Sequence, residues 1–545
     1  MKVLRIYVAD DGDTLRKISI KKDVEIEELI SFNPHIASPD LDITGGHVKL
    51  PDLYQPIRNK VNIPPCPDNS INYQEQWIPL TSLEKMEQTD YDVLIVGTGA
   101  GGGAALWRLC EQWGENGKRI GVLEAGDLLL PTNAQNIATV DHERLLKYFY
   151  SVAKSPHQYP SPQVTALGGR TLFWTSVSPR MHVSEIVEWP VTVKVMEFYY
   201  KIAEKVMDVT QDFTKGSSIT QTFLNRLQGN GFPESTDEPI AINLEPTKYG
   251  VVNSNAFFSS ISFLAQALNR SFDLAVKARA VQVLTEKDKV IGIKVVSPEK
   301  KSYFIKAKTV VLSASTFETP RILLHSGIQG RAIGHYLINH SRLVGTGKVS
   351  RNEFPEILGP LRILIPGTED RPYQVQIWGP GKYPWVHFKE QPLRGEWEVN
   401  FYGSGKVESQ FDNKVILDPL KRDEYGVPEI QVNFTFSKQD EVVIRQMAEG
   451  MKQASSAMNV PLISKDGQSD VCLMPPGLEN HEMGTCRMGD DPLTSATNRY
   501  GQVHGVHGLY VADNSVIPTS GTANPTLTTV ALAIRTADYI IHQLK

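Results

Sequence analysis

Three glycines at a fixed spacing form the part of the sequence best suited to hold a ligand. They are Gly97, Gly99 and Gly102, in the pattern that binds the pyrophosphate of a dinucleotide. The first glycine permits a tight turn, the second lets the backbone approach a phosphate, and the third lets a helix pack closely on a strand. Free N–H groups and the dipole at the start of that helix would stabilise the anion.

The segments on either side of the glycines predict the βαβ unit that this pattern requires. Residues 91–96 are an almost wholly apolar run, as expected of a buried parallel strand. A helical apolar pattern follows, and residues 119–123 predict a second strand that ends at Glu124. An acid at that position can accept hydrogen bonds from ribose hydroxyls. The sequence therefore predicts a dinucleotide site rather than a glycine-rich turn without a ligand, but this motif does not choose between FAD and NAD.

Other motifs for catalysis or metal binding are incomplete. His481 and Glu482 begin like the zinc motif HExxH, but residue 485 is Thr, so the second histidine ligand is missing. The sequence has neither a nucleophile elbow nor a P-loop. The cysteines are few and far apart, which fits neither a disulfide framework nor a metal site: Cys66, Cys110, Cys472 and Cys486. We expect no metal.

The composition is that of an ordinary globular protein of several domains. The chain has 545 residues with 41% hydrophobic residues and a net charge of -5, and its acids and bases are mixed. This gives no basic surface for nucleic acid and no basic amphipathic stretch for a membrane. No apolar run approaches the roughly 18 residues of a membrane span, and the N-terminus lacks a signal-peptide pattern. A cytoplasmic location is the default expectation.

Residues 1–53 predict a small separate module in the order strand, helix, helix, strand (βααβ). Its residues resemble a LysM domain at these positions: Tyr7, Gly12, Asp13, Thr14, Leu15, Ile18, Leu29, Asn33, Pro34, Gly46, Leu50 and Pro51. The resemblance implies binding of glycans that contain N-acetylglucosamine. A module kept for packing or for oligomer contact is the alternative, favoured because no signal peptide takes it to a cell wall. Residues 54–87 are rich in proline and predict a linker.

Six further blocks continue the pattern that begins at the glycines: residues 167–175, 310–327, 330–340, 481–489, 503–515 and 524–528. In order and spacing they resemble the glucose–methanol–choline (GMC) oxidoreductases, from about residue 91 to the C-terminus with a poorly matched middle. Within that family, Asn524-Pro525-Thr526 and the Leu-Gly-Gly sequence at 167–169 are most similar to pyranose oxidases and related sugar or glycoside oxidoreductases.

This resemblance implies an FAD cofactor and the residues that line it: Gly168, Gly169, Thr171, Thr175, Asp513, Asn514, Asn524, Pro525 and Thr526. Pyranose oxidases often carry a histidine that bonds covalently to the flavin. Phe173 stands at the matching position and cannot form that bond, so we expect non-covalent FAD. Thr175 matches a threonine near the reactive flavin nitrogen.

The resemblance also implies a catalytic pair, His481 and Asn524. Oxidation of an alcohol removes a hydroxyl proton and a hydride, and histidine suits the first task because its pKa lies near neutrality. Asn524 would hydrogen-bond the same hydroxyl. The alternative for His481 is a buried structural histidine, and we interpret His504 and His507 in that way.

We expect an α/β + α+β fold, with a Rossmann-like FAD-binding domain and an antiparallel-sheet substrate domain after the βααβ module. The FAD domain takes residues 88–181, 245–345 and 480–545, and the substrate domain takes 182–244 and 346–479. A region with Trp378, Trp385 and Trp397 could stack a sugar ring, but aromatic strand residues are more often core.

The expected reaction is oxidation of a sugar or glycoside hydroxyl. The alternatives are oxidation of a sterol or aryl alcohol, a non-redox lyase on the same fold, and a glycan-binding protein with an inert flavin domain. The electron acceptor (dioxygen, a quinone or a protein) stays open.

Overall fold

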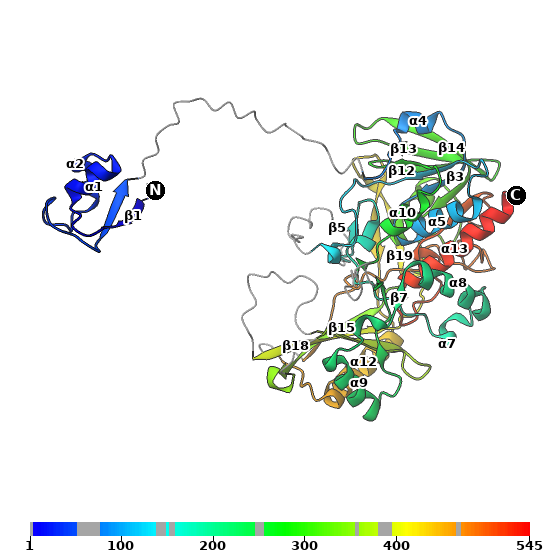
Figure 1. The fold of residues 1–545 in the computed structure, drawn as a ribbon. Helices are drawn as coiled ribbons and strands as arrows, with labels where there is room; N and C mark the ends of the chain where they lie inside the picture. Colours follow the sequence, from blue (N-terminus) through cyan, green and yellow to red (C-terminus); the bar gives the residue numbers. More distant parts are fainter. Residues whose placement is uncertain are drawn as a thin grey trace. The chain divides into compact units, whose positions relative to one another are not determined.

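The computed structural model describes residues 4–51, 77–137, 149–151, 159–245, 256–354, 359–379, 395–464 and 470–545. The chain divides into two compact units, Met1–Asn72 and Tyr73–Lys545, both drawn in Figure 1. Trp385 lies outside the described residues.

The first unit has the predicted order of strand, helix, helix, strand. Its elements are β1 (Leu4–Val8), α1 (Leu15–Lys22), α2 (Ile26–Phe32) and β2 (His47–Pro51). The two strands pair antiparallel, and a small core forms from Leu15, Ile18, Leu29 and Val48. The Thr14 side chain caps α1 by accepting from the Lys17 N–H, as its position in the turn predicts.

The second unit is built on a sheet of seven described strands. Five of them are parallel: β3 (Tyr91–Val96), β4 (Ile120–Leu123), β11 (Asp273–Ala275), β14 (Ser302–Leu312) and β22 (Leu509–Val511). Two are antiparallel: β12 (Arg279–Glu286) and β13 (Lys289–Val296). Every residue of β3 and β4 is buried, which explains their continuous apolar sequence.

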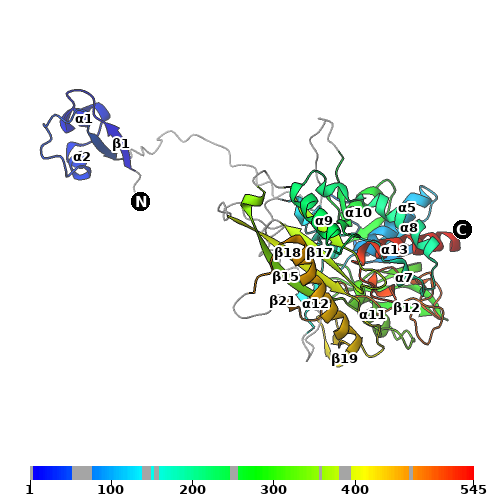
Figure 2. The same ribbon diagram turned by 90° about the horizontal axis from the view of Figure 1, so that it is seen from below.

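Long helices pack beside this sheet around the C-terminal helix. α13 lies against both α5 and α8, and the three helices are side by side in Figures 1 and 2. The helices of this part are α4 (Leu83–Glu87), α5 (Ala100–Trp113), α7 (Val183–Ile186), α8 (Val193–Val206), α10 (Ile261–Ala267), α11 (Ser315–His325) and α13 (Thr526–Gln543).

Two of the expected domain boundaries do not match the hydrophobic core to which the residues belong. Leu83 and Met86 are buried in the same core as β3, so residues 77–87 belong to this fold although the prolines suggested a linker through residue 87. Met196 and Tyr200 on α8 are buried in that core too, although we expected 182–244 in the substrate domain. Both segments have apolar residues at helical spacing, and which sheet they cover depends on the tertiary fold.

A second sheet has six described strands, antiparallel to one another. They are β8 (Thr236–Asp237), β15 (Ser341–Ser350), β16 (Leu361–Ile365), β17 (Tyr373–Gly379), β18 (Glu396–Gly405) and β21 (Val471–Leu473). One face packs its apolar residues on α9 (Ser218–Gly229) and α12 (Lys438–Met458), and Figure 2 shows α12 lying along these strands. Alternate residues point to the opposite face, which carries Arg342, Gln376, Trp378 and Tyr402. This is the expected antiparallel substrate sheet.

The remaining strands form small pairs and a three-stranded sheet among the described residues. They are β5 (Phe149–Ser151) with β6 (Pro162–Val164), β19 (Lys414–Arg422) with β20 (Pro428–Asn433), and β7 (Val209–Thr210) with β9 (Ile240–Asn243) and β10 (Ala256–Phe257). Among the described helices, none has the length and apolar character needed to cross a bilayer.

The two units should fold independently, because each has its own core. We expect deletion of residues 1–53 to leave the unfolding temperature of the second unit unchanged in differential scanning calorimetry. A large drop in that temperature in the truncated protein would show that the first unit is part of the larger core.

Candidate functional site

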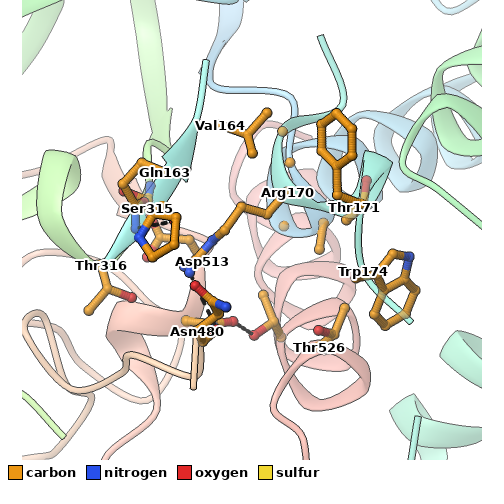
Figure 3. Close-up of a pocket in the computed structure, with 18 of the residues that line it drawn as sticks. Gln163, Val164, Arg170, Thr171, Trp174, Ser315, Thr316, Asn480, Asp513 and Thr526 are labelled. Carbon is orange, nitrogen blue, oxygen red and sulfur yellow. Dashed lines mark hydrogen bonds between the residues drawn. The ribbon is translucent and has the colours of Figure 1, made fainter. Parts of the chain in front are cut away.

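A cavity of about 570 Å³ lies between the glycine-rich turn after β3 and the polar face of the six-stranded sheet. Most of the site residues expected from the sequence line it: Gly97, Gly99, Glu124, Gly169, Thr171, Thr175, His481, Asp513, Asn514, Asn524 and Thr526. Figure 3 shows the Arg170 side chain reaching toward Asp513 and Asn480, where it donates to the Asn480 carbonyl oxygen at 3.3 Å. Segments hundreds of residues apart in sequence therefore meet at one cavity.

Three other expected residues shape the cavity from outside its lining. A Cβ on Gly102 would lie 2.0 Å from the Gly97 carbonyl oxygen, so only glycine allows α5 to pack this closely. Gly168 has a φ of +92° and donates its N–H to Thr98 Oγ1 at 2.9 Å. Pro525 is the residue from which α13 begins.

The glycine turn leaves free N–H groups and free space at the cavity. Gly99 is the N-cap of α5 and has no side chain with which to cap it. A Cβ added to Gly99 would meet nothing within 4 Å. By contrast, a Cβ on Gly101 would lie 1.7 Å from the Ala512 carbonyl oxygen, so α5 and the end of β22 touch backbone to backbone. An anionic group can therefore approach the start of α5 at Gly99.

Glu124 is already bound to the glycine turn. Its Oε2 accepts from the Thr98 N–H at 3.1 Å and from the Thr98 hydroxyl at 2.5 Å, and its Oε1 accepts from the Gly126 N–H. Burial raises the pKa of this carboxyl. Glu124 thus holds the turn in shape, and contact with ribose hydroxyls would be an additional role.

Asp513 performs a similar task at the start of α11. Its Oδ2 accepts from the Ser315 N–H at 3.1 Å and from the Thr319 hydroxyl at 2.6 Å, and its Oδ1 accepts from the Ser515 N–H. Ser315 lines the cavity, and its backbone has a φ of +96°, which residues other than glycine rarely adopt. The carboxylate therefore supports a strained backbone beside the ligand space.

The structure brings the two expected catalytic residues together. His481 Nε2 lies 3.2 Å from Asn524 Nδ2 at the sheet end of the cavity. The Asn524 Oδ1 accepts from Gln374 at 2.9 Å and from Gln376 at 2.6 Å, both on β17. Because the amide oxygen is held by these two donors, the amide nitrogen faces the histidine.

On the side of His481 opposite Asn524 lie three residues that the sequence analysis did not predict as site residues: His340, Arg342 and Glu479. His481 Nδ1 lies 3.0 Å from His340 Nδ1 and 3.1 Å from Glu479 Oε1, and Arg342 donates to the same carboxylate oxygen at 2.7 Å. Burial alone would raise the pKa of Glu479, but Arg342 and His481 outweigh it and hold the pKa at about 2. Burial, together with His481, lowers the pKa of His340 to about 4.

The sequence held a partial signal for this cluster. Glu479 stands two residues before His481, and His340 ends the block 330–340. The possible ligand atoms of the three side chains lie within 4.8 Å of one another, a spacing that a cation would accept. Arg342 already neutralises the carboxylate and hydrogen bonds account for the ring positions, so the arrangement does not require a metal.

The tryptophans divide between the two faces of the substrate sheet. Trp378 lines the cavity, contrary to the expectation that these aromatic residues are core. Trp397 packs against the apolar core on the other face. The strand register explains the difference. Trp378 pairs with Asn400 on β18, and Trp397 lies three residues from Asn400 on that strand, so it points to the opposite face.

Comparisons with known proteins agree with this architecture. Residues 93–342 and 409–533 match two family models, each described as GMC oxidoreductase. A C-glycoside 3-oxidase from Arthrobacter globiformis is 25% identical over 397 residues, covering 69% of this chain and 74% of that protein. A pyranose 2-oxidase from Tricholoma matsutake is 23% identical over 444 residues, covering 71% and 74%.

Solved structures show the same fold. Pyridoxine 4-oxidase from Mesorbium loti superposes with a TM-score of 0.62 at 16% identity, covering 83% of this chain and 99% of that one. A formate oxidase variant from Aspergillus oryzae, studied for FAD modification, gives a TM-score of 0.63 at 15% identity, covering 84% and 98%.

The glycine turn offers a matched test of cofactor binding. Gly99→Ala places a methyl group in the open space at the start of α5, so we expect FAD binding to weaken roughly tenfold or more while the fold stays intact. Gly101→Ala forces α5 away from β22, so the fold itself should lose about 1–3 kcal/mol of stability. Gly229→Ala, at the end of α9 and also in open space, is the control. FAD titration and thermal unfolding distinguish the variants, and unchanged affinity in Gly99→Ala would contradict this placement.

Proposed function

We propose, on the premise that the chain belongs to the GMC oxidoreductase family, that it oxidises a CH–OH group of a sugar or glycoside with His481 as the base. Members of this family are flavoproteins, and the protein binds FAD. The observation that carries the proposal is the 3.2 Å separation of His481 Nε2 and Asn524 Nδ2 at the cavity.

The cavity fits FAD at both of its ends. Gly99 leaves room for the pyrophosphate at the start of α5, and Glu124 ends the second strand. α13 also begins at the cavity, where its N-cap Pro525 has no capping group and Thr526 lines the space. A second helix N-terminus suits the electron-rich side of a flavin ring. When bound, FAD supplies the acceptor for a hydride.

The protein side chains perform the proton chemistry and the orientation. His481 Nε2 takes the proton from the substrate hydroxyl, and Asn524 Nδ2 donates a hydrogen bond to the oxygen of that hydroxyl. Gln374 and Gln376 hold the amide, so the hydroxyl is aligned before the reaction.

The side chains of the cavity wall opposite the glycine turn favour a sugar substrate over a hydrocarbon alcohol. Gln376 and Arg342 offer donors, and Trp378 and Tyr402 offer apolar surface, a mixture that fits a polyhydroxylated ring. The related C-glycoside 3-oxidase and pyranose 2-oxidase are named for such substrates.

A non-sugar alcohol is the second candidate. A 2-methyl-1,2-propanediol dehydrogenase from Mycolicibacterium austroafricanum is 24% identical over 536 residues and covers 82% of this chain. The electron acceptor stays open, and glycan binding by the LysM-like first unit remains a prediction.

FAD should be held without a covalent bond. Phe173 lines the cavity at the position where a linking histidine would stand, and a phenyl ring cannot form that bond. We expect acid precipitation of the yellow protein to leave all of the FAD in the supernatant, measured by its absorbance. Flavin that stays with the precipitated chain would contradict this assignment.

The catalytic pair is tested by two single substitutions. His481→Ala removes the base, so flavin reduction by substrate should slow roughly 100-fold or more and recover partly at high pH, where the hydroxyl loses its proton more readily. Asn524→Ala keeps the base but loosens the alcohol, so a smaller slowing with weaker substrate binding is expected. Anaerobic stopped-flow measurements give both quantities.

Both variants should retain FAD, since the pyrophosphate site at Gly99 is intact. Near wild-type reduction in His481→Ala would remove His481 as the base and leave the reaction class resting on the family alone.

A further inference from the structure

The hydrogen bonds of His340 determine which of its nitrogens carries a proton. His340 Nε2 lies 3.1 Å from the Ser520 carbonyl oxygen, which only accepts, so Nε2 carries the hydrogen. Burial and His481 lower the pKa of His340 to about 4, so its ring is neutral near pH 7. A neutral imidazole protonated at Nε2 has a lone pair at Nδ1.

That lone pair determines the tautomer of His481 in turn. His481 Nδ1 faces two acceptors, His340 Nδ1 at 3.0 Å and Glu479 Oε1 at 3.1 Å. A nitrogen between two acceptors must carry the proton, because three lone pairs at this distance would repel one another. In neutral His481 the lone pair is therefore at Nε2, which faces Asn524 and the cavity.

We propose that His340 and Glu479 are positioning residues that keep the proton of His481 on Nδ1, so that its Nε2 lone pair is always presented to the substrate hydroxyl. This inference rests on the proposed role of His481 as base. Glu479 has a second effect: its carboxylate stabilises the imidazolium that forms when Nε2 takes the proton. The proton moves from the hydroxyl oxygen to Nε2 and stays there, while the proton on Nδ1 remains in place and none passes to Glu479.

Glu479 is itself held by a row of side chains on the cavity face of the substrate sheet. Its Oε1 accepts from Arg342 and from the Ser404 hydroxyl, each at 2.7 Å. The Arg342 guanidinium lies over the Tyr402 ring at 4.6 Å, and the Tyr402 ring lies 4.7 Å from the Trp378 ring. These contacts cross three adjacent strands, β15, β18 and β17.

The far end of this row is fixed by a second buried carboxylate. Arg362 lies over the Trp378 ring at 4.2 Å and donates to Glu238 at 3.1 Å, and the Trp378 indole N–H donates to the same carboxylate at 3.0 Å. Between Glu238 and Glu479 the two adjacent aromatic rings, Trp378 and Tyr402, thus lie between two cations, Arg362 and Arg342. Arg342 is confined by its neighbours, and it confines Glu479.

A purely structural role for Glu479 makes a different prediction. A buried ion pair that only holds the sheet to the C-terminal segment would affect stability and leave the His481 tautomer unchanged. Among the described residues, the titratable groups in contact with His481 are His340 and Glu479, and Arg342 is bound to the far side of this pair through Glu479. The neighbouring Glu482 points away, to Arg170 at 2.8 Å and the Ser161 hydroxyl at 2.5 Å.

The direct test is the protonation site of His481 in the full-length FAD-loaded protein. With ¹⁵N-labelled histidine, NMR shifts distinguish a protonated ring nitrogen from one with a lone pair, and the His481 signals are assigned by their loss in His481→Ala. We expect the wild-type protein at pH 8 to carry the proton on Nδ1. The double variant His340→Phe with Glu479→Gln should show a mixture of tautomers.

Glu482→Gln is the matched control, because it replaces a buried carboxylate one residue from His481 that does not face Nδ1. We expect it to keep the wild-type tautomer. A wild-type His481 protonated on Nε2, or a double variant with the wild-type tautomer, overturns the inference.

A kinetic readout separates this inference from the proposed function. With D-glucose as the reductant, Glu479→Gln should slow flavin reduction roughly tenfold or more and move the acid limb of its pH profile to lower pH. Glu479→Asp should restore part of the rate. If His481→Ala reduces as fast as the wild type, the proposed function fails, while the NMR result still decides the tautomer. If His481→Ala is slow but the Glu479→Gln pH profile is unchanged, the stabilisation of the imidazolium by Glu479 fails, and the proposed function stands.

Discussion

The site depends on one close backbone contact, between the first turn of α5 and the end of β22. The Ala512 carbonyl oxygen occupies the place where a Cβ on Gly101 would stand. This contact brings the N-terminal turn of α5 against Ala512, the residue before Asp513, and Asp513 in turn holds the start of α11. The chain then runs from Asp513 to Asn524 and into α13. The glycine-turn end and the Asn524 end of the cavity are therefore fixed by the same short segment, residues 512–526.

The substrate sheet supplies the other wall through the two-residue period of its strands. Residues such as Ile377 and Phe401 face α12 and form a core, while their neighbours Gln376 and Tyr402 face the cavity. The cavity residues are held in place by this arrangement, because the opposite face of the strands that carry them is packed in a core. The Asn524 amide is consequently oriented by hydrogen bonds from Gln374 and Gln376.

The glycine turn could be predicted from local sequence. The hydrogen bonds of His481 with His340 and Glu479 depend on long-range packing and could not. Gly97, Gly99 and Gly102 follow one another in the chain, so their spacing alone predicts the turn and the βαβ unit that contains it. His481 and Asn524 were paired by family resemblance. Pairing of β15 with β21 brings together His340, Arg342 and Glu479. No periodicity in the sequence predicts that pairing. The position of α8 was missed for the same reason: its amphipathic pattern predicts a buried face but not the partner that covers it.

The buried charges around the base are a poor route to stability. Removing Glu479 and Arg342 from water, and likewise Glu238 and Arg362, carries a desolvation cost. Attraction to Arg342 and His481 outweighs burial at the Glu479 carboxyl, whereas burial prevails at Glu238 and raises the pKa of its carboxyl. Apolar residues of the same volume would serve a structural core as well. In the proposed mechanism, the charges provide orientation that exists before substrate arrives: the Glu479 carboxylate stands where positive charge would develop on His481, and it need not reorganise during the reaction. On this proposal the free-energy cost of placing the charges falls on folding, and the site does not reorganise again in the chemical step.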